Sequence, residues 1–123
     1  MNKIDLTPLV GSQILCEFWD NESPEGFFQR GFLSRIGVGV FRDEFETAYQ
    51  NCRIYQHPDY WISSVNLIGQ AFPSGLVARI TLNDGRGYEC ITNGTRFINI
   101  DDGFHAGHIS AVQVIGPADG WAY

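Results

Sequence analysis

The chain has 123 residues, 44% of them hydrophobic and 18% charged, and its formal net charge is −6. A single domain of this length carries enough apolar material to offset chain entropy, which excludes an acidic disordered tail. The arginines are scattered singly and there is one lysine, so we expect no direct binding to nucleic acid. No apolar run approaches the roughly 20 residues of a membrane span, so we expect a cytoplasmic protein that does not bind a membrane. The first ten residues, "MNKIDLTPLV", also lack the apolar region of a signal peptide.

The first predicted element is a strand over residues 14–19. Ile14, Cys16 and Phe18 alternate with residues that would face the other side. The acidic sequence "DNESPEG" follows and predicts the loop at the end of this strand.

The next apolar stretch covers residues 30–41 and predicts a strand over 30–36. Gly37 and Gly39 indicate a bulge, or a bend at the corner of a barrel. The only helical candidate is 42–51, which is equally compatible with a loop because it has no defined stop.

The second half of the chain supplies four predicted strands, at 76–82, 86–92, 96–100 and 109–115. Asp84 and Gly85 stand between the first two, and this pair tolerates the positive φ angles of a tight turn. The two strands on either side are therefore expected to form an antiparallel hairpin.

These elements predict an all-β protein with at most one short helix. We expect one compact domain, made of two small SH3-like antiparallel sheets that pack together or merge into one barrel. The sequence divides into halves at about 1–55 and 75–123, and an aromatic segment, 56–74, joins them.

The three cysteines, Cys16, Cys52 and Cys90, are odd in number and far apart. This pattern is neither a disulfide framework nor a zinc motif. Each lies in a strand-like run, where a free cysteine is a small buried hydrophobe. We expect all three to be reduced and buried.

No nucleophile motif, phosphate-binding glycine loop or zinc-protease motif is present, so we expect neither enzymatic activity nor a cofactor. The most metal-like stretch contains Asp101, Asp102, His105 and His108. A polar loop is the favoured interpretation, because a metal site would also need supporting groups around its ligands. Whether this loop binds anything is left open.

The loop containing Asp20, Glu22 and Glu25 could bind a cation or a basic partner. Its carboxylates lack the regular spacing of a calcium loop, so a solvated hairpin tip is favoured over a metal site. As a candidate interface, the loop would suit a partner with a basic surface.

Aromatic residues gather in "NCRIYQHPDYWISS", residues 51–64. Tyr55, His57 and Tyr60 are predicted on the rim of a binding surface, because connecting segments lie at the surface and tyrosine contributes strongly to interfaces. Trp61 is predicted inside, as part of a structural seam between the two halves. Trp121 is predicted to fold back onto the same seam, since a free tail would ordinarily be polar.

Four stretches carry a resemblance: "TPLVGSQILCEFWDNESPEGFFQRGFLSRI", "NCRIYQHPDYW", "FPSGLVARITLNDG" and "ISAVQVIGPADGWAY". Together they resemble a group of small accessory proteins of tailed bacteriophages and prophages of enterobacteria. The likeness covers nearly the whole chain and departs at "LNDG", where an arginine is usual, and in "DDGFHAGH". It implies an accessory product, neither capsid nor polymerase, that acts by binding.

Two functions remain open from the sequence. The first is a non-catalytic binding protein that occupies a host or defence protein. The second is a receptor or sponge for a nucleotide-like small molecule, held between the sheets or between two copies of a homodimer. Its ligand would stack on aromatic rings and meet arginines, for which the candidates are Tyr60, Trp61, Trp121, Arg53, Arg79 and Arg96.

Overall fold

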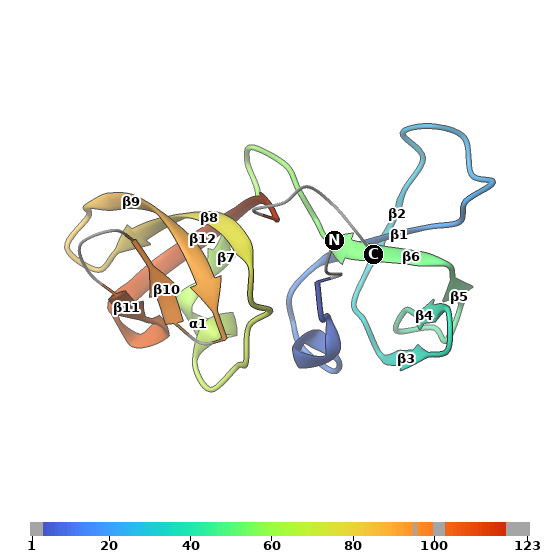
Figure 1. The fold of residues 1–123 in the computed structure, drawn as a ribbon, viewed down its shortest axis with the longest axis horizontal. Helices are drawn as coiled ribbons and strands as arrows, with labels where there is room; N and C mark the ends of the chain where they lie inside the picture. The colour runs from blue at the N-terminus through green and yellow to red at the C-terminus, as the bar shows by residue number, and fades with distance from the viewer. Residues whose placement is uncertain (1–3, 95, 100–102, 118–123) are drawn as a thin grey trace.

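The computed structural model describes residues 4–94, 96–99 and 103–117. Two lobes lie side by side, an N-terminal lobe up to residue 54 and a C-terminal lobe from residue 62 (Figure 1). Over the described residues the protein is predominantly β, with three antiparallel sheets and one short α-helix, which confirms the predicted class. None of the helices in these ranges has the length and apolar character needed to span a bilayer.

The N-terminal lobe is built from short strands. Its elements are a 3₁₀ turn η1 (Thr7–Leu9), β1 (Cys16–Trp19), β2 (Gln29–Gly31), β3 (Arg35–Gly37), β4 (Val40–Arg42), β5 (Ala48–Tyr49) and β6 (Asn51–Ile54). They form two three-stranded sheets in the orders β2-β1-β6 and β3-β4-β5.

The strand predicted over 30–36 is divided into β2 and β3. The Glu44 carboxylate accepts a hydrogen bond from the Phe32 N–H at 2.7 Å, in place of a neighbouring strand. A Cβ on Gly31 would lie 2.5 Å from the same carboxylate, so the glycine leaves room for it. A side chain distant in sequence therefore ends the strand.

The glycines at 37 and 39 mark a hairpin turn, neither a bulge nor a barrel corner, and Gly37 ends β3 opposite Val40. Gly39 has φ +67°, in the turn between β3 and β4. The helical candidate at 42–51 is instead a turn between short strands. Asp43 accepts hydrogen bonds from the N–H groups of Phe45 and Thr47, and Glu46 has φ +64°, which a helix does not tolerate.

The C-terminal lobe contains one six-stranded sheet in the order β11-β10-β9-β8-β12-β7. Its elements are β7 (Ile62–Ser63), α1 (Ser64–Leu67), β8 (Leu76–Leu82), β9 (Gly87–Asn93), β10 (Arg96–Ile98), β11 (Gly103–His105), a 3₁₀ turn η2 (Ala106–His108) and β12 (Ile109–Pro117). The predicted hairpin is confirmed: Gly85 has φ +92° and donates to the Leu82 carbonyl at 2.9 Å.

Of the two arrangements that the sequence left open, packed sheets or one merged barrel, the merged barrel is wrong. Within the described residues none of the three sheets closes on itself, and β11 and β7 form the two edges of the largest sheet. The strands of the N-terminal lobe are two to four residues long, and they divide between two sheets instead of extending the larger one.

The crossing between the lobes is shorter than the predicted segment 56–74. Ile62 and Ser63 already pair with β12, so only residues 55–61 cross. The side-chain amide of Gln113, on β12, donates to the carbonyls of His57 at 3.2 Å and Pro58 at 2.6 Å. These hydrogen bonds fix the crossing segment against the C-terminal sheet.

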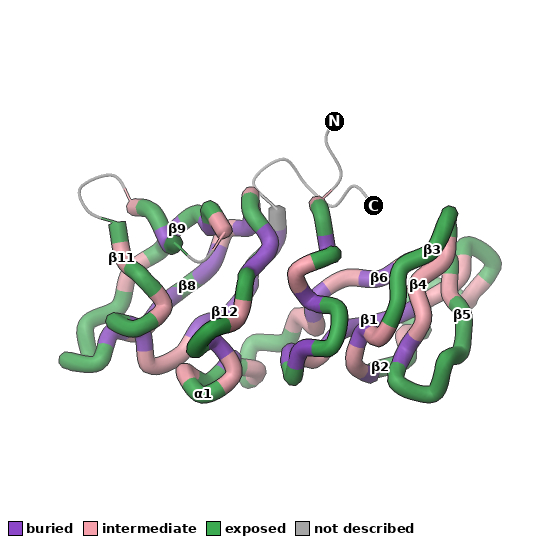
Figure 2. The backbone as a smooth tube through the Cα atoms, turned by 90° about the horizontal axis from the view of Figure 1, so that it is seen from below, coloured by how far each residue is buried: buried purple, intermediate pink, exposed green. Residues whose placement is uncertain are grey.

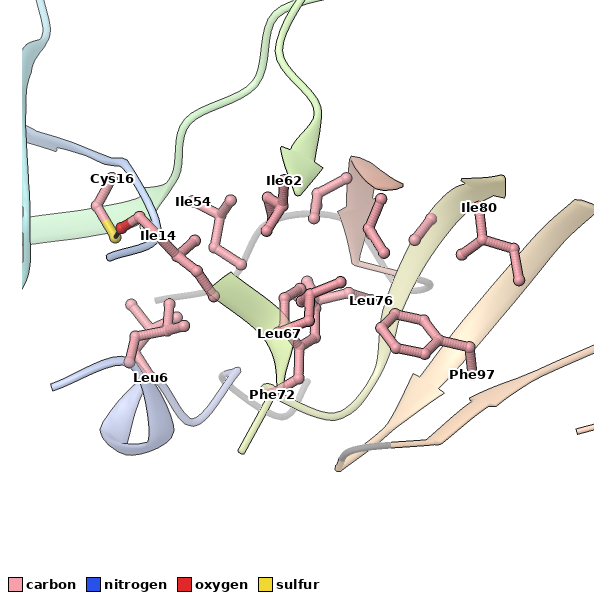
Figure 3. Close-up of a cluster of buried hydrophobic side chains, with 14 of the residues drawn as sticks. Leu6, Ile14, Cys16, Ile54, Ile62, Leu67, Phe72, Leu76, Ile80 and Phe97 are labelled. Atoms are coloured by element: carbon pink, nitrogen blue, oxygen red, sulfur yellow. Dashed lines mark hydrogen bonds between the residues drawn. The ribbon is translucent and has the colours of Figure 1, made fainter. Parts of the chain in front are cut away.

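One hydrophobic cluster runs through both lobes (Figure 3). Ile14 and Ile54 from the first lobe lie near Ile62 and Leu67 from the second, all at most 1% exposed. Buried residues accordingly recur along β1, β6, β8 and β12 (Figure 2). The lobes are therefore joined by packing as well as by the chain.

The three cysteines are buried and free, as predicted. Cys16 and Cys52 lie on the neighbouring strands β1 and β6. A hydrogen bond with Cys16, together with burial, raises the pKa of the Cys52 thiol. Burial, and to a lesser extent the charge of Glu89, raises the pKa of Cys90.

Candidate protein-binding face

The sheet β2-β1-β6 has two different faces. Its inner face places Cys16, Phe18 and Ile54 in the core. Its outer face carries the residues between them, starting with Glu17, which lies opposite both Arg30 on β2 and Arg53 on β6. A carboxylate between two arginines thus occupies the centre of the outer face.

Glu17 is only 3% exposed, although it lies on the outer face. Its carboxylate accepts hydrogen bonds from the guanidinium of Arg53 at 3.1 and 3.3 Å and from the Gln56 N–H at 3.1 Å. A buried charge is tolerated when it is paired and hydrogen-bonded in this way. The ion pair therefore anchors the arginine at a fixed position on the sheet.

Aromatic rings surround these arginines. The Arg53 guanidinium lies 5.2 Å from the ring centre of Trp19 and 4.6 Å from that of Phe28. The two rings meet edge to face at 5.2 Å. The Arg30 guanidinium lies 4.9 Å from the ring centre of Tyr55. We call this set of side chains the Arg–aromatic layer: Trp19, Phe28, Arg30, Arg53 and Tyr55.

The predicted rim residues Tyr55, His57 and Tyr60 do come together. The ring of Tyr55 stacks on His57 at 6.0 Å and contacts Tyr60 at 5.3 Å. Their depths differ: His57 is exposed, whereas Tyr60 packs against the core. The Tyr60 hydroxyl accepts a hydrogen bond from the Leu15 N–H at 3.0 Å, and burial raises its pKa. Tyr60 is therefore mainly structural, and Tyr55 and His57 form the accessible part.

The acidic loop begins where β1 ends, at the other end of the same face. Asp20 has a structural contact, because its carboxylate accepts from the Gln50 N–H at 2.9 Å. Glu22 and Glu25 are exposed. Asp20 lies five positions after Leu15, whose carbonyl accepts a hydrogen bond from the Tyr55 N–H, so about 16 Å of extended chain separates the two predicted groups. The Arg–aromatic layer fills that interval.

The inward position predicted for Trp61 is wrong. Its side chain is 40% exposed, whereas the neighbouring Tyr60 packs on the core. Successive residues of an extended segment point to opposite sides, so only one of the two can face inward. The hydrogen bond between the Tyr60 hydroxyl and Leu15, just before β1, fixes Tyr60 as that residue. Trp121 lies outside the described residues.

Few of the residues proposed for a nucleotide-like ligand meet in one place. Arg53 is held by Glu17, and Tyr60 is turned to the core. Trp61 and Arg79 do line a common hollow of about 290 Å³, but Glu89 lines it too, and its carboxylate would repel a phosphate.

The metal-like loop is only partly described. Asp101 and Asp102 lie outside the described residues. The rings of His105 and His108 are 6.1 Å apart and nearly perpendicular. Over the residues that the structure covers, no group of three or more histidine, cysteine, aspartate or glutamate side chains could hold a metal ion.

Most of the Arg–aromatic layer was not singled out from the sequence as an interface. A signal was available, because the members of the layer, together with Glu17, occur in pairs two residues apart, in or next to the strands β1, β2 and β6. Glu17 and Trp19, Phe28 and Arg30, and Arg53 and Tyr55 are these pairs. Their register across the sheet, which local patterns do not specify, is what brings them together.

Comparison with protein-family models, with curated proteins and with solved structures finds no match for this chain.

Proposed function

We propose that this protein is a non-catalytic binding protein and that its Arg–aromatic layer docks on another protein. One observation carries the proposal. The outer face of a small antiparallel sheet, which is ordinarily polar when it faces water, instead presents aromatic rings interleaved with arginines.

The composition of this face matches the centre of protein interfaces. Tryptophan, tyrosine and arginine contribute most of the binding energy at such centres. Arg53 and Trp19 are already held in fixed positions by the Glu17 ion pair and by ring contacts. A partner would therefore meet an ordered surface, with little loss of side-chain entropy on binding.

The surroundings of the layer specify the chemistry of the partner. Glu22 and Glu25 border one end, and the whole chain carries a net charge of −6. Such a surface favours a partner with basic groups around an apolar centre, and long-range attraction speeds association. The resemblance to phage accessory proteins makes a host or defence protein of an enterobacterium the proposed partner. The SH3-like character predicted for each half belongs to this proposal, since modules of that kind bind peptides through aromatic grooves.

Affinity capture from an enterobacterial lysate tests the proposal. The bait is the full chain, compared with Tyr55→Ala and Arg30→Ser, which change accessible parts of the layer. Val38→Ser is the matched control, because Val38 is fully exposed in the β3–β4 turn, outside the layer. We expect a host protein that the wild type and the control retain and that both layer variants lose. Identical capture by all four proteins would refute the proposal, as would failure to capture any protein.

A thermal-shift panel separates the alternative function. Binding to the native state alone raises the melting temperature by mass action. A clear rise with a nucleotide, unaffected by the two layer variants, would favour the small-molecule receptor over the protein-binding function.

A further inference from the structure

The outer face of the C-terminal sheet carries an exposed apolar row. Val77 on β8 lies opposite Ile91 on β9, which lies opposite Ile98 on β10. On the other side of Val77, a bulge in β12 between Val114 and Gly116 contains Ile115. The three isoleucines are 40–48% exposed. Four apolar side chains therefore cross four neighbouring strands in one line.

A charged row runs beside the apolar one. Arg79 and Glu89 lie opposite each other on β8 and β9, two residues along from Val77 and Ile91. Despite this position, neither forms an ion pair with any described residue. The Arg79 guanidinium donates a hydrogen bond to the side-chain oxygen of Gln113, at 3.5 Å. One positive and one negative group thus stand side by side on this face, and the crossing segment borders them on the β12 side, where His57 and Pro58 line a hollow together with Arg79.

The ends of the apolar row are shaped differently. A hollow of about 630 Å³ lies at the β9–β10 end, where Ile91 and Ile98 contribute to its lining. Ile115 projects from the bulge at the β12 end. The apolar row therefore has a hollow at its β10 end and the projecting side chain of Ile115 at its β12 end.

We infer that a second copy of this chain packs on this face, sheet against sheet. The two-fold axis would run parallel to the strands and between β8 and β9. That rotation exchanges the two central strands, so Val77 faces Ile91 of the second copy and Arg79 faces Glu89 of the second copy. It also places Ile115 over the hollow beside Ile98 of the second copy. The interface is isologous, because each contact occurs twice.

Charge complementarity favours a second copy over an unrelated partner. Under this rotation the positive charge on β8 of each copy meets the negative charge on β9 of the other. The apolar row likewise meets the apolar row of the second copy. Sheets that pack face to face lie about 10 Å apart, with side chains of the two faces interdigitating. The exposed isoleucines would be removed from water in the same step. This dimer is independent of the function proposed for the N-terminal lobe.

Analytical ultracentrifugation over a range of protein concentrations tests this inference by charge reversal. Wild type is expected to dimerise. Arg79→Glu places two like charges at each contact, and so does Glu89→Arg, so each change should weaken dimerisation by more than about tenfold. Arg35→Glu is the matched control. It changes the net charge as Arg79→Glu does, but Arg35 is an exposed residue of β3 in the other lobe.

The two single variants also complement each other. Mixing Arg79→Glu protein with Glu89→Arg protein restores both attractive contacts, so a heterodimer is expected, and the double variant should dimerise like the wild type. Recovery on mixing also shows that both variants are folded. A wild type that stays monomeric at every concentration would overturn the inference, and so would a dimer that neither charge reversal weakens.

Discussion

The two lobes of this protein reach stable β-structure by different routes. The C-terminal lobe contains strands of seven and nine residues, paired along one sheet, and alternate side chains of β8 enter the core. The N-terminal lobe has strands of two to four residues, and side chains such as Asp43 and Glu44 complete its backbone hydrogen bonds. Packing of regular strands dominates in one lobe, and side-chain contacts with backbone groups dominate in the other.

The largest expected effect comes from removing a core ring of the C-terminal lobe. Phe97 is fully buried and its ring lies 5.5 Å from that of Phe72. Phe97→Ala should lower the free energy of unfolding by ~3–5 kcal/mol, from lost burial and the cavity that remains. Phe45→Ala is the matched control, because Phe45 is 80% exposed. This variant should change the free energy of unfolding by less than about 0.5 kcal/mol. Denaturant unfolding measures both, and equal effects would contradict the core assignment.

The next effect tests the hydrogen bonds of the N-terminal lobe. Asp43 is 7% exposed, and its carboxylate accepts from two backbone N–H groups, at 2.9 and 3.0 Å. Asp43→Ala should destabilise the protein by ~1–3 kcal/mol, because both donors lose their acceptor in a partly buried site.

Asp43→Asn keeps one side-chain oxygen and should recover part of that loss in the same unfolding measurement. If the alanine variant is as stable as the wild type, the turn does not depend on this side chain, and the contrast between the lobes is wrong.

A smaller effect separates two adjacent aromatic residues at the crossing between the lobes. Tyr60→Phe removes the hydroxyl that accepts from the Leu15 N–H and should cost ~1 kcal/mol. Trp61→Phe should cost less than about 0.5 kcal/mol, since Trp61 is 40% exposed. The reverse order of stabilities would restore Trp61 as the structural residue.

The smallest effect concerns the rates at which the thiols react. The raised pKa values of Cys52 and Cys90 mean that these groups stay protonated and unreactive until the chain opens locally. We expect slow labelling by a thiol reagent in native buffer, with Cys52 labelled before Cys90 because the short strands of the N-terminal lobe open more readily. Mass spectrometry of the labelled peptides measures the order, and rapid labelling of all three cysteines would contradict their burial.

The same thiols make stability depend on pH. A pKa that folding raises means that the folded state holds its proton more tightly than the unfolded chain does. Their contribution to stability is therefore complete below the ordinary thiol pKa of about 8.5 and decreases as the pH rises above it. Unfolding curves on either side of that value should show lower stability on the alkaline side.

The sequence by itself determined the elements whose signals are local. Alternation over 76–82 gave β8 with the observed bounds, Asp84 and Gly85 gave the hairpin turn, and apolar flanks gave the buried cysteines. These predictions succeed because the alternation of a strand and the positive φ angle of a tight turn are both set by residues next to one another in the sequence. The grouping of Tyr55, His57 and Tyr60 was also visible in sequence, since they are close together in the chain.

Only the tertiary structure decided the rest. Glu44 ends β2 from thirteen residues beyond Gly31, and Asp43 converts a helix-like pattern into a turn. The register of β2-β1-β6 assembles the Arg–aromatic layer from three separate strands, and Tyr60 rather than Trp61 packs against the core. Each outcome depends on contacts between groups distant in sequence. Strand register is one such contact, and a side chain that accepts from a backbone N–H is another, and neither produces a pattern among neighbouring residues of the sequence.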